Sequence, residues 1–244
     1  MEQEFWFGTL LNKWFGGIVA SLMLKVGITS SNPHQPIPGY VAGEILVFLV
    51  IVIAVLILRQ RLSVENPGKF QQSMEVFLEF TRGLVDDMIG HEGRRYVALI
   101  GTLGIFVGVC NLLGLIPTLQ TPTASVPVTL GCAVLAFVYY NFQGVRQHGV
   151  FGYLRHLCRP MLAIAILMLP TELISNTLRM LSLTVRLWAN MLVGGILEKV
   201  FTSLIPIAIP TVFMALHIFE SFLQAYVFMI LPALYISLAV AEEH

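Results

Sequence analysis

Fifty consecutive residues without a charged side chain, at positions 96–145, constrain the fold most strongly. A helix that crosses the roughly 30 Å hydrocarbon core of a bilayer needs about 20 apolar residues. The run is therefore too long for one span, and three prolines between residues 117 and 127 interrupt it. We expect two membrane-spanning helices, at about 96–116 and 126–142, joined by a short proline-rich turn.

The composition of the whole chain indicates the same class. Of 244 residues, 57% are hydrophobic and 11% are charged, against about 25% charged in a typical soluble domain. The net charge is zero, which gives no sign of a nucleic-acid partner. The three cysteines are far apart and lack metal-ligand spacing, so we expect buried thiols and neither a metal nor a cofactor. The chain is predicted to be an all-α, polytopic membrane protein.

Three further apolar runs complete a set of about five spanning helices. The first covers residues 39–58, with Glu44 as its only charge, and we prefer a hydrated interfacial position for that carboxyl over a role in an ion path. The others cover residues 161–203 and 211–241. At 1.5 Å per residue the run 161–203 would be about 60 Å long. Its helix must therefore be broken, strongly tilted or both.

The polar segments set the surface helix and the orientation. Residues 59–95 hold six basic and six acidic side chains, and hydrophobic residues at helical spacing within them predict an amphipathic surface helix at about 70–90. Residues 1–36 are expected to form an interfacial segment and a loop, ahead of a single membrane domain over 37–244. The positive-inside rule places 59–95 and the basic stretch 144–160 in the cytoplasm. The N-terminus is then outside and, after five crossings, the C-terminus is cytoplasmic.

Arg186 lies in an apolar run that is otherwise suited to lipid. A guanidinium stays protonated at any ordinary pH, and at the bilayer centre it costs roughly 2.5–3.5 kcal/mol on insertion scales. Its neighbours one turn away, Ser182 and Asn190, carry no charge. The counter-ion of Arg186 is therefore expected on another helix or on another protein.

Polar residues form a stripe along the helix that carries Arg186. At about 100° per residue, five of them share a face about 80° wide. They are Glu172, Asn176, Arg179, Arg186 and Asn190. Mutual neutralisation of Glu172 and Arg179 stays open as an alternative to a channel role, and Asn176 is more simply an interhelical hydrogen-bonding residue.

The last predicted helix has a smaller stripe of the same kind. It consists of His217, Glu220 and Gln224. Two neighbouring long helices with polar stripes favour a hydrated path or a face turned toward a polar partner.

Four motifs, in the same order, resemble subunit a of rotary F-type ATP synthases. S-L-x-x-R-L-x-x-N-M at residues 182–191 is similar to the family signature. N-P-G-K-F-Q at 66–71, N-L-L-G-L-I-P at 111–117 and Q-A-Y-V-F at 224–228, with Tyr235-Ile236 after it, resemble three further segments of the family. The resemblance covers roughly residues 37–241, and the first 35 residues carry no such motif.

The resemblance implies a function. Subunit a is the stator of the membrane motor, with two offset half-channels that lead protons to and from carboxylates on a rotating ring of c subunits. Arg186 matches the essential arginine that couples proton flow to ring rotation and ATP synthesis. Glu172, Asn190 and Gln224 match polar positions of the path, with Asn176, Arg179 and Asn111 as a secondary polar set. The last two helices would form a long tilted hairpin along the ring.

The resemblance also implies partners and a location. The partners would be the c ring, the peripheral-stalk b subunits, the rest of the ATP synthase complex and the lipid bilayer. The subunit itself would be non-catalytic and would need no cofactor. A bacterial inner membrane is expected, with an organellar energy-transducing membrane as the alternative.

Some positions depart from the family pattern. Ser125 and Pro127 stand where the family often has Asp and Asn, and Gly195 stands where some members have an acid. The outer half-channel would then depend on His217, Glu220 and Glu172.

Two other classes of protein fit the sequence less well. An ion-coupled secondary transporter would predict internal repeats, which the sequence does not show. A scaffold subunit without an ion path would leave Arg186 without a reason. The sequence leaves open whether the ion is H⁺ or Na⁺.

Overall fold

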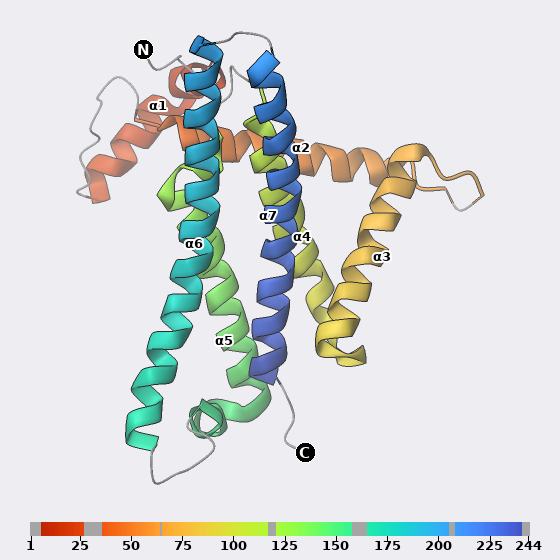
Figure 1. The fold of residues 1–244 in the computed structure, drawn as a ribbon, viewed down its shortest axis with the longest axis vertical. Helices are drawn as coiled ribbons and strands as arrows, with labels where there is room; N and C mark the ends of the chain where they lie inside the picture. Colours follow the sequence, from red (N-terminus) through yellow and green to blue (C-terminus); the bar gives the residue numbers. More distant parts are fainter. Residues whose placement is uncertain are drawn as a thin grey trace.

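The computed structural model describes residues 6–26, 36–63, 65–116, 121–157, 165–204 and 208–240 (Figure 1). The regular elements in these ranges are helices. In chain order they are α1 (Trp6–Val26), α2 (Gly39–Gln60), α3 (Lys69–Ile89), η1 (His91–Tyr96), α4 (Val97–Leu113), η2 (Pro122–Ala124), α5 (Val126–Leu157), α6 (Ala165–Leu204) and α7 (Ala208–Val240). The all-α class is confirmed.

Five helical stretches are long and apolar enough to cross a membrane. They are Gly39–Gln60, Gly93–Leu113, Val126–Gln147, Thr177–Ser203 and Thr211–Val240. They agree in number and order with the five predicted spans. A segment that crosses the hydrocarbon core must hydrogen-bond its own backbone N–H and C=O groups, as a helix does. These five helices therefore make the chain a multi-pass membrane protein.

Two helix ends differ from the prediction. Helix α4 ends at Leu113 rather than near residue 116, and α5 continues to Leu157 rather than ending near 142. The basic stretch 144–160, interpreted as a loop, is therefore helical up to Leu157, with a kink at Gly149 (φ 70°, ψ 166°). The basic residues after 142 suggested a loop, but Arg and Gln are good helix formers and the helix continues through them. The regular helical geometry is interrupted at Gly149, whose positive φ glycine adopts at little cost because it has no Cβ atom.

Helix α6 is unbroken from Ala165 to Leu204, including the position of Pro170. Of the two predicted alternatives, a break and a strong tilt, the described helix shows no break, so its length must be accommodated by tilt. Figure 1 shows α2 running across the direction of α6 and α7. The 22 residues of α2 measure about 33 Å, which fits an upright span. With α2 upright, the α6–α7 hairpin lies strongly tilted.

Helices α4 and α7 occupy the middle of the bundle and share two buried apolar clusters. One cluster joins α3, α4, α5 and α7 around Tyr96, Ile100 and Tyr140. The other joins α4, α5, α6 and α7 around Val107, Leu187 and Phe228. Cys110 and Cys132 are free and buried, as expected for structural thiols. The buried face of α6 is thereby fixed against three other helices.

The packing of α4 on α7 depends on Gly104. A Cβ at this position would lie 2.6 Å from Cγ of the buried Met229. Replacing Gly104 by Ala should therefore destabilise the subunit by about 1–3 kcal/mol through overpacking. The melting temperature of the detergent-solubilised complex and the amount of the chain in membranes measure this effect.

Gly131 is the matched control for that substitution. It lies on the exposed side of α5, with nothing within 4 Å of an added Cβ. Gly131→Ala should leave stability unchanged or slightly higher, since alanine is the better helix former. Equal melting temperatures for the two variants would show that the contact between α4 and α7 tolerates a side chain.

Helix α3 is amphipathic, as predicted. Thr81, Leu84 and Val85 are buried, and Phe77 and Met88 pack against the first cluster. The Ser237 hydroxyl of α7 donates a hydrogen bond of 2.6 Å to the Met88 carbonyl at the end of α3. The helix is thus joined to the bundle along one face while its charged face stays exposed.

Helix α1 packs against the beginning of α2. The Asn12 amide donates to the Ile37 carbonyl (3.1 Å) and accepts from the Ile37 N–H (2.9 Å). Trp6 and Trp14 are exposed, which suits aromatic side chains at a membrane interface. The interfacial position of residues 1–36 stays a prediction.

Candidate functional site

The antiparallel helices α6 and α7 meet along a seam of paired side chains. Three pairs define it: the stacked rings of Phe201 and Phe213 (4.5 Å between centroids), Asn190 and Gln224 (3.4 Å), and Arg179 over the ring of Tyr235 (5.4 Å). Successive pairs are eleven residues apart on both helices, from 201 to 190 to 179 and from 213 to 224 to 235. Eleven residues make about three helical turns, so each pair returns to the same side of the seam.

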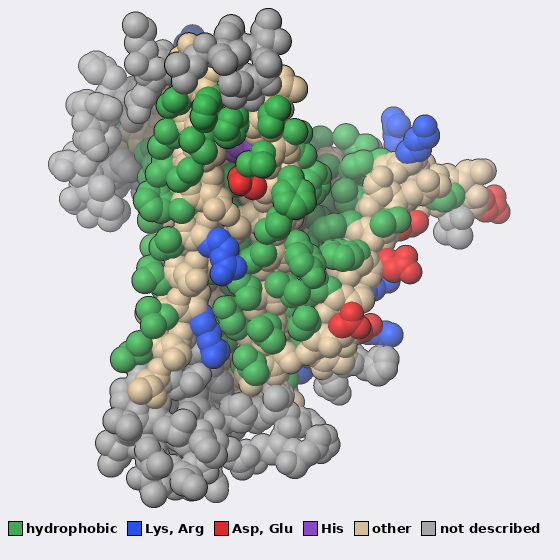
Figure 2. Space-filling model, viewed as in Figure 1, with side chains coloured by type: hydrophobic (Ala, Val, Ile, Leu, Met, Phe, Trp, Pro, Cys, Tyr) green, Lys and Arg blue, Asp and Glu red, His purple; other side chains and the backbone are tan. Residues whose placement is uncertain are grey.

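Arg186 lies on the exposed side of α6, next to this seam. The side chain is exposed, whereas Leu183 and Leu187 beside it are buried in the second cluster. Within the residues that the structure describes, Arg186 has no ion pair or hydrogen bond. Figure 2 shows basic side chains on α6 within a largely hydrophobic face. A permanent charge is thus presented outward on an apolar surface.

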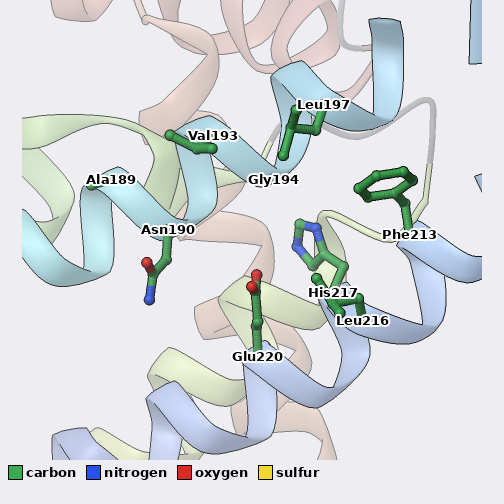
Figure 3. A pocket seen from close by; sticks show the side chains of 9 residues that line it. All are labelled: Ala189, Asn190, Val193, Gly194, Leu197, Phe213, Leu216, His217 and Glu220. Carbon is green, nitrogen blue, oxygen red and sulfur yellow. The ribbon is translucent and has the colours of Figure 1, made fainter. Parts of the chain in front are cut away.

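A pocket of about 170 Å³ lies between α6 and α7, toward the turn that joins them. Its polar side chains are Asn190 of α6 and His217 and Glu220 of α7. Figure 3 shows His217 and Glu220 pointing from α7 toward α6. One water needs about 10–15 Å³, so the pocket has room for several.

His217 fits closely against α6 because Gly194 has no side chain. A Cβ on Gly194 would lie 3.2 Å from the His217 Nδ1 atom. His217 is 4% exposed, and its Nε2 atom has no hydrogen-bond partner among the described residues. Gly195, by contrast, would meet nothing within 4 Å. The residue that shapes the pocket here is therefore Gly194, not its neighbour.

Gln224 connects the pocket to the middle of the seam. It is fully buried, and its Oε1 atom accepts the hydrogen bond from the Asn190 amide. Its Nε2 atom has no partner in the described part of the chain. Buried polar groups in proteins are nearly always satisfied by protein or water. The two orphan nitrogens of His217 and Gln224 therefore mark a place suited to water.

Asn111 belongs to a different part of the bundle than the α6 stripe. It lies at the end of α4, is fully buried, and accepts a hydrogen bond of 2.7 Å from the Thr123 hydroxyl. Its Nδ2 atom also lacks a partner among the described residues. Contacts of α4 on α7 at Gly104 and Gly108 involve Met229 and Ala225. Asn111 lies about one turn further along α4 than Gly108, and thus beyond the level of Ala225.

The structure thus brings together part of the predicted set. Asn190, His217, Glu220 and Gln224 meet at the pocket and the seam, and Arg186 lies beside them. Arg179 pairs with Tyr235 instead of a pocket residue. The side chains of Glu172 and Asn176 lie outside the described residues. Ser125 is half-buried, and the η2 residue Thr123 contacts Asn111 in the region where the family pattern departs.

Tyr235 and Gly194 are two residues at this site whose roles the sequence did not predict. A signal was present, because Tyr235 follows Gln224 by the same eleven residues that separate Arg179 from Asn190. Among the described residues, no group of three His, Cys, Asp or Glu side chains could hold a metal ion.

The fold and this site define a class of protein. It is a polytopic α-helical membrane protein whose last two helices enclose a polar seam beside an outward-facing arginine. A family model described as ATP synthase A chain matches residues 42–237. The chain belongs to this family.

Individual relatives agree with that assignment. An ATP synthase subunit a from Koribacter versatilis is 41% identical over 244 residues, the whole of both chains. An ATP synthase subunit a from Solibacter usitatus is 45% identical over 219 residues, which are 89% of this chain and 94% of the relative. One from a Sulfurihydrogenibium species is 40% identical over 179 residues, 73% of this chain and 86% of the relative. The matches do not favour a secondary transporter.

Proposed function

We propose that this chain is the proton-conducting stator subunit of a rotary ATP synthase, working against a ring of small subunits with membrane-embedded carboxylates. The observation that carries the proposal is Arg186, exposed on an apolar face of α6. A charge in lipid requires an anionic partner or water. An acid on a neighbouring moving protein supplies that partner, which the described part of this chain does not.

Arg186 acts on each arriving carboxyl group by electrostatics. An ionised carboxylate is costly at the lipid face, so ring carboxyls cross it in the neutral form. Opposite a guanidinium the charged form is favoured and the pKa of the ring carboxyl falls. The proton is then released toward one side, and the carboxylate takes up a new proton from the other side after it passes. Arg186 has no proton to exchange, so it also separates the two paths.

The pocket provides the path from outside. An outside N-terminus and five crossings put the turn between α6 and α7 on the outer side, and the pocket lies toward that turn. His217 and Glu220 can exchange protons with water in it, and the amides of Asn190 and Gln224 extend the polar lining toward Arg186. Glu172, which the sequence suggested for the outer half-channel, belongs to the N-terminal part of α6, away from the α6–α7 turn, and would instead serve the path to the cytoplasm. The membrane potential drives the transfer with about 2.3 kcal/mol per charge per 100 mV.

The chain forms and breaks no bond of ATP in this scheme. Its partners are the ring, the peripheral-stalk b subunits and the rest of the complex, in a bacterial inner membrane. The N-terminus lies outside and the C-terminus in the cytoplasm, because the basic stretches 59–95 and 144–160 then face inward.

Photo-cross-linking tests the contact with the ring. A photoreactive amino acid at Val193, which is 50% exposed about two turns from Arg186 on the same face, should form adducts with the small ring subunit in the intact complex. The same group at Ile53, which is 53% exposed on α2, is the control and should not. Ring adducts from Ile53 alone would place the ring on a different face and contradict the proposal.

A further inference from the structure

Glu44 is the only acidic residue of α2, and the proposed function gives it no role. It follows the first residue of the helix by five positions, which is about 8 Å along the axis. An ionised carboxylate at this depth needs water or a polar partner. The sequence favoured a hydrated interfacial position for Glu44 over a place in an ion path. Its surroundings in the structure favour the ion path.

Glu44 lies at the edge of the face through which α2 packs on α4 and η2. Three residues of this face are buried: Ala42, Gly43 and Val47. Glu44 itself is half-buried. Its carboxylate interacts electrostatically with the thiols of Cys110 on α4 and Cys132 on α5. The carboxylate is therefore close to buried groups of two other helices.

The elements around α2 contain no other acid. The helices α1, α4, η2 and α5 have neither Asp nor Glu in their sequences. Tyr40, one turn before Glu44 on α2, is half-buried, and Lys13 of α1 is exposed. Glu44 is thus the one carboxyl that this side of the bundle can offer to a proton.

Asn111 connects this side of α4 to the level of the pocket. Gly108 of α4 lies against Ala225 of α7, and the glycine contacts show that the two helices run antiparallel. Three positions further along α4, Asn111 therefore lies at a level between those of Glu220 and Gln224. The Nδ2 atom of the fully buried Asn111, like Nε2 of Gln224, has no hydrogen-bond partner among the described residues. Water is the usual partner of such buried donors.

The short helix η2 continues the polar groups from Asn111 toward α2. It packs against α2, α4, α5 and α6. Its Thr123 hydroxyl donates a hydrogen bond of 2.7 Å to the Asn111 Oδ1 atom. Cys110, which interacts with Glu44, directly precedes Asn111 on α4. Polar side chains thus extend from Gln224 through Asn111 and Thr123 to the side of α4 that meets Glu44.

We propose that Glu44 is a further proton-exchanging residue of the outer path, supplied by α2 and joined to the pocket by water around Asn111 and Thr123. This inference rests on the proposed function, which puts the beginning of α2 and the pocket on the same, outer side. The carboxylate takes up a proton from outer water and returns it to water on the side of Asn111, so the group is regenerated unchanged. Its negative charge also raises the local concentration of cations at the mouth of the path.

The test measures passive proton flux through membranes that contain the assembled complex without its catalytic head. Glu44→Gln keeps the shape of the side chain and removes its titration. Flux should fall about tenfold, less than the roughly 100-fold effect of a typical proton-transfer group, because water near the surface partly replaces the carboxyl. Glu44→Asp keeps a carboxyl and should stay near wild type. Glu65→Gln, which neutralises an exposed acid between α2 and α3, is the control and should have no effect.

The dependence on outer pH separates proton exchange from a structural role. The loss of flux in Glu44→Gln should be larger at alkaline than at acidic outer pH, because a fixed proton acceptor matters most where free protons are scarce. A structural defect lowers flux by the same factor at every pH. Wild-type flux in Glu44→Gln, or a loss that is equal at all outer pH values, would overturn the role of Glu44.

A double variant tests the connection through Asn111. Asn111→Leu should lower flux, and adding it to Glu44→Gln should lower flux no further than the larger single effect, since both residues serve one path. Effects that multiply would contradict that connection. If Asn111→Leu does not assemble, Thr123→Val, which removes the hydroxyl and keeps the volume, replaces it. Loss of synthesis in Arg186→Ala together with wild-type flux in Glu44→Gln would reject only the role of Glu44.

Discussion

Replacing Arg186 by alanine should abolish proton-driven ATP synthesis in membranes that contain the assembled complex. Without the guanidinium at position 186, arriving ring carboxyls would keep their protons and the ring would not be driven. Synthesis is measured in inverted vesicles with an imposed proton gradient, with assembly checked by co-purification of the ring. Normal synthesis in this variant would remove the basis of the proposed function.

Lysine at position 186 should fail or nearly fail as well. It keeps a positive charge, but a compact ammonium does not reproduce the planar fork of donors and can lose its proton in an apolar environment. Arg82→Ala is the matched control, since Arg82 is an exposed arginine of α3 outside the seam, and this substitution should leave synthesis unchanged.

Passive proton flux through membranes stripped of the catalytic head should persist in Arg186→Ala, because the charge that separates the two paths is lost.

Neutralising the pocket should have the opposite effect on passive flux. His217→Ala and Glu220→Gln should each lower both passive flux and synthesis by about tenfold, and together by about 100-fold, the lower range for a positioned proton-transfer group. The reason is that these two side chains are the titratable groups lining the pocket.

Glu79→Gln is the control for the pocket variants, because Glu79 is an exposed carboxylate of α3. It should behave as wild type in both assays. Unchanged proton flux in a variant with His217, Glu220 and Glu172 all neutralised would show that protons do not follow this face. Comparing Arg186→Ala with the pocket variants separates proton conduction from coupling. Arg186→Ala should lose coupling and keep passive flux, whereas the variants of His217 and Glu220 should lose passive flux.

Helix number and type were predictable because lipid imposes a simple rule. A span needs about 20 apolar residues, and runs of that kind are visible in the sequence without knowledge of any contact. Helix ends were less predictable. Charges after residue 142 indicated a loop, yet α5 continues to Leu157, because basic residues can continue a helix beyond the apolar run. The length of the run 161–203 required a break or a tilt, and α6 is continuous from Ala165 to Leu204.

Side-chain partners were the least predictable part of the site. Helical periodicity placed Arg179, Arg186 and Asn190 on one face of α6, but an 80° stripe does not state which of them points toward a neighbour. In the structure Asn190 contacts Gln224, Arg179 contacts Tyr235, and Arg186 is exposed. A small rotation of α6 about its own axis decides between these environments.

The sequence by itself determined the class of protein, the five apolar spans, the two polar stripes and the absence of an acidic residue within one helical turn of Arg186. These properties depend on composition and on the 3.6-residue period, which are local. Only the tertiary structure decided the register of α6 on α7, the pocket around His217 and the outward direction of Arg186. Register depends on how Leu183, Leu187 and Phe228 pack in a shared cluster, and that packing is a property of several helices together.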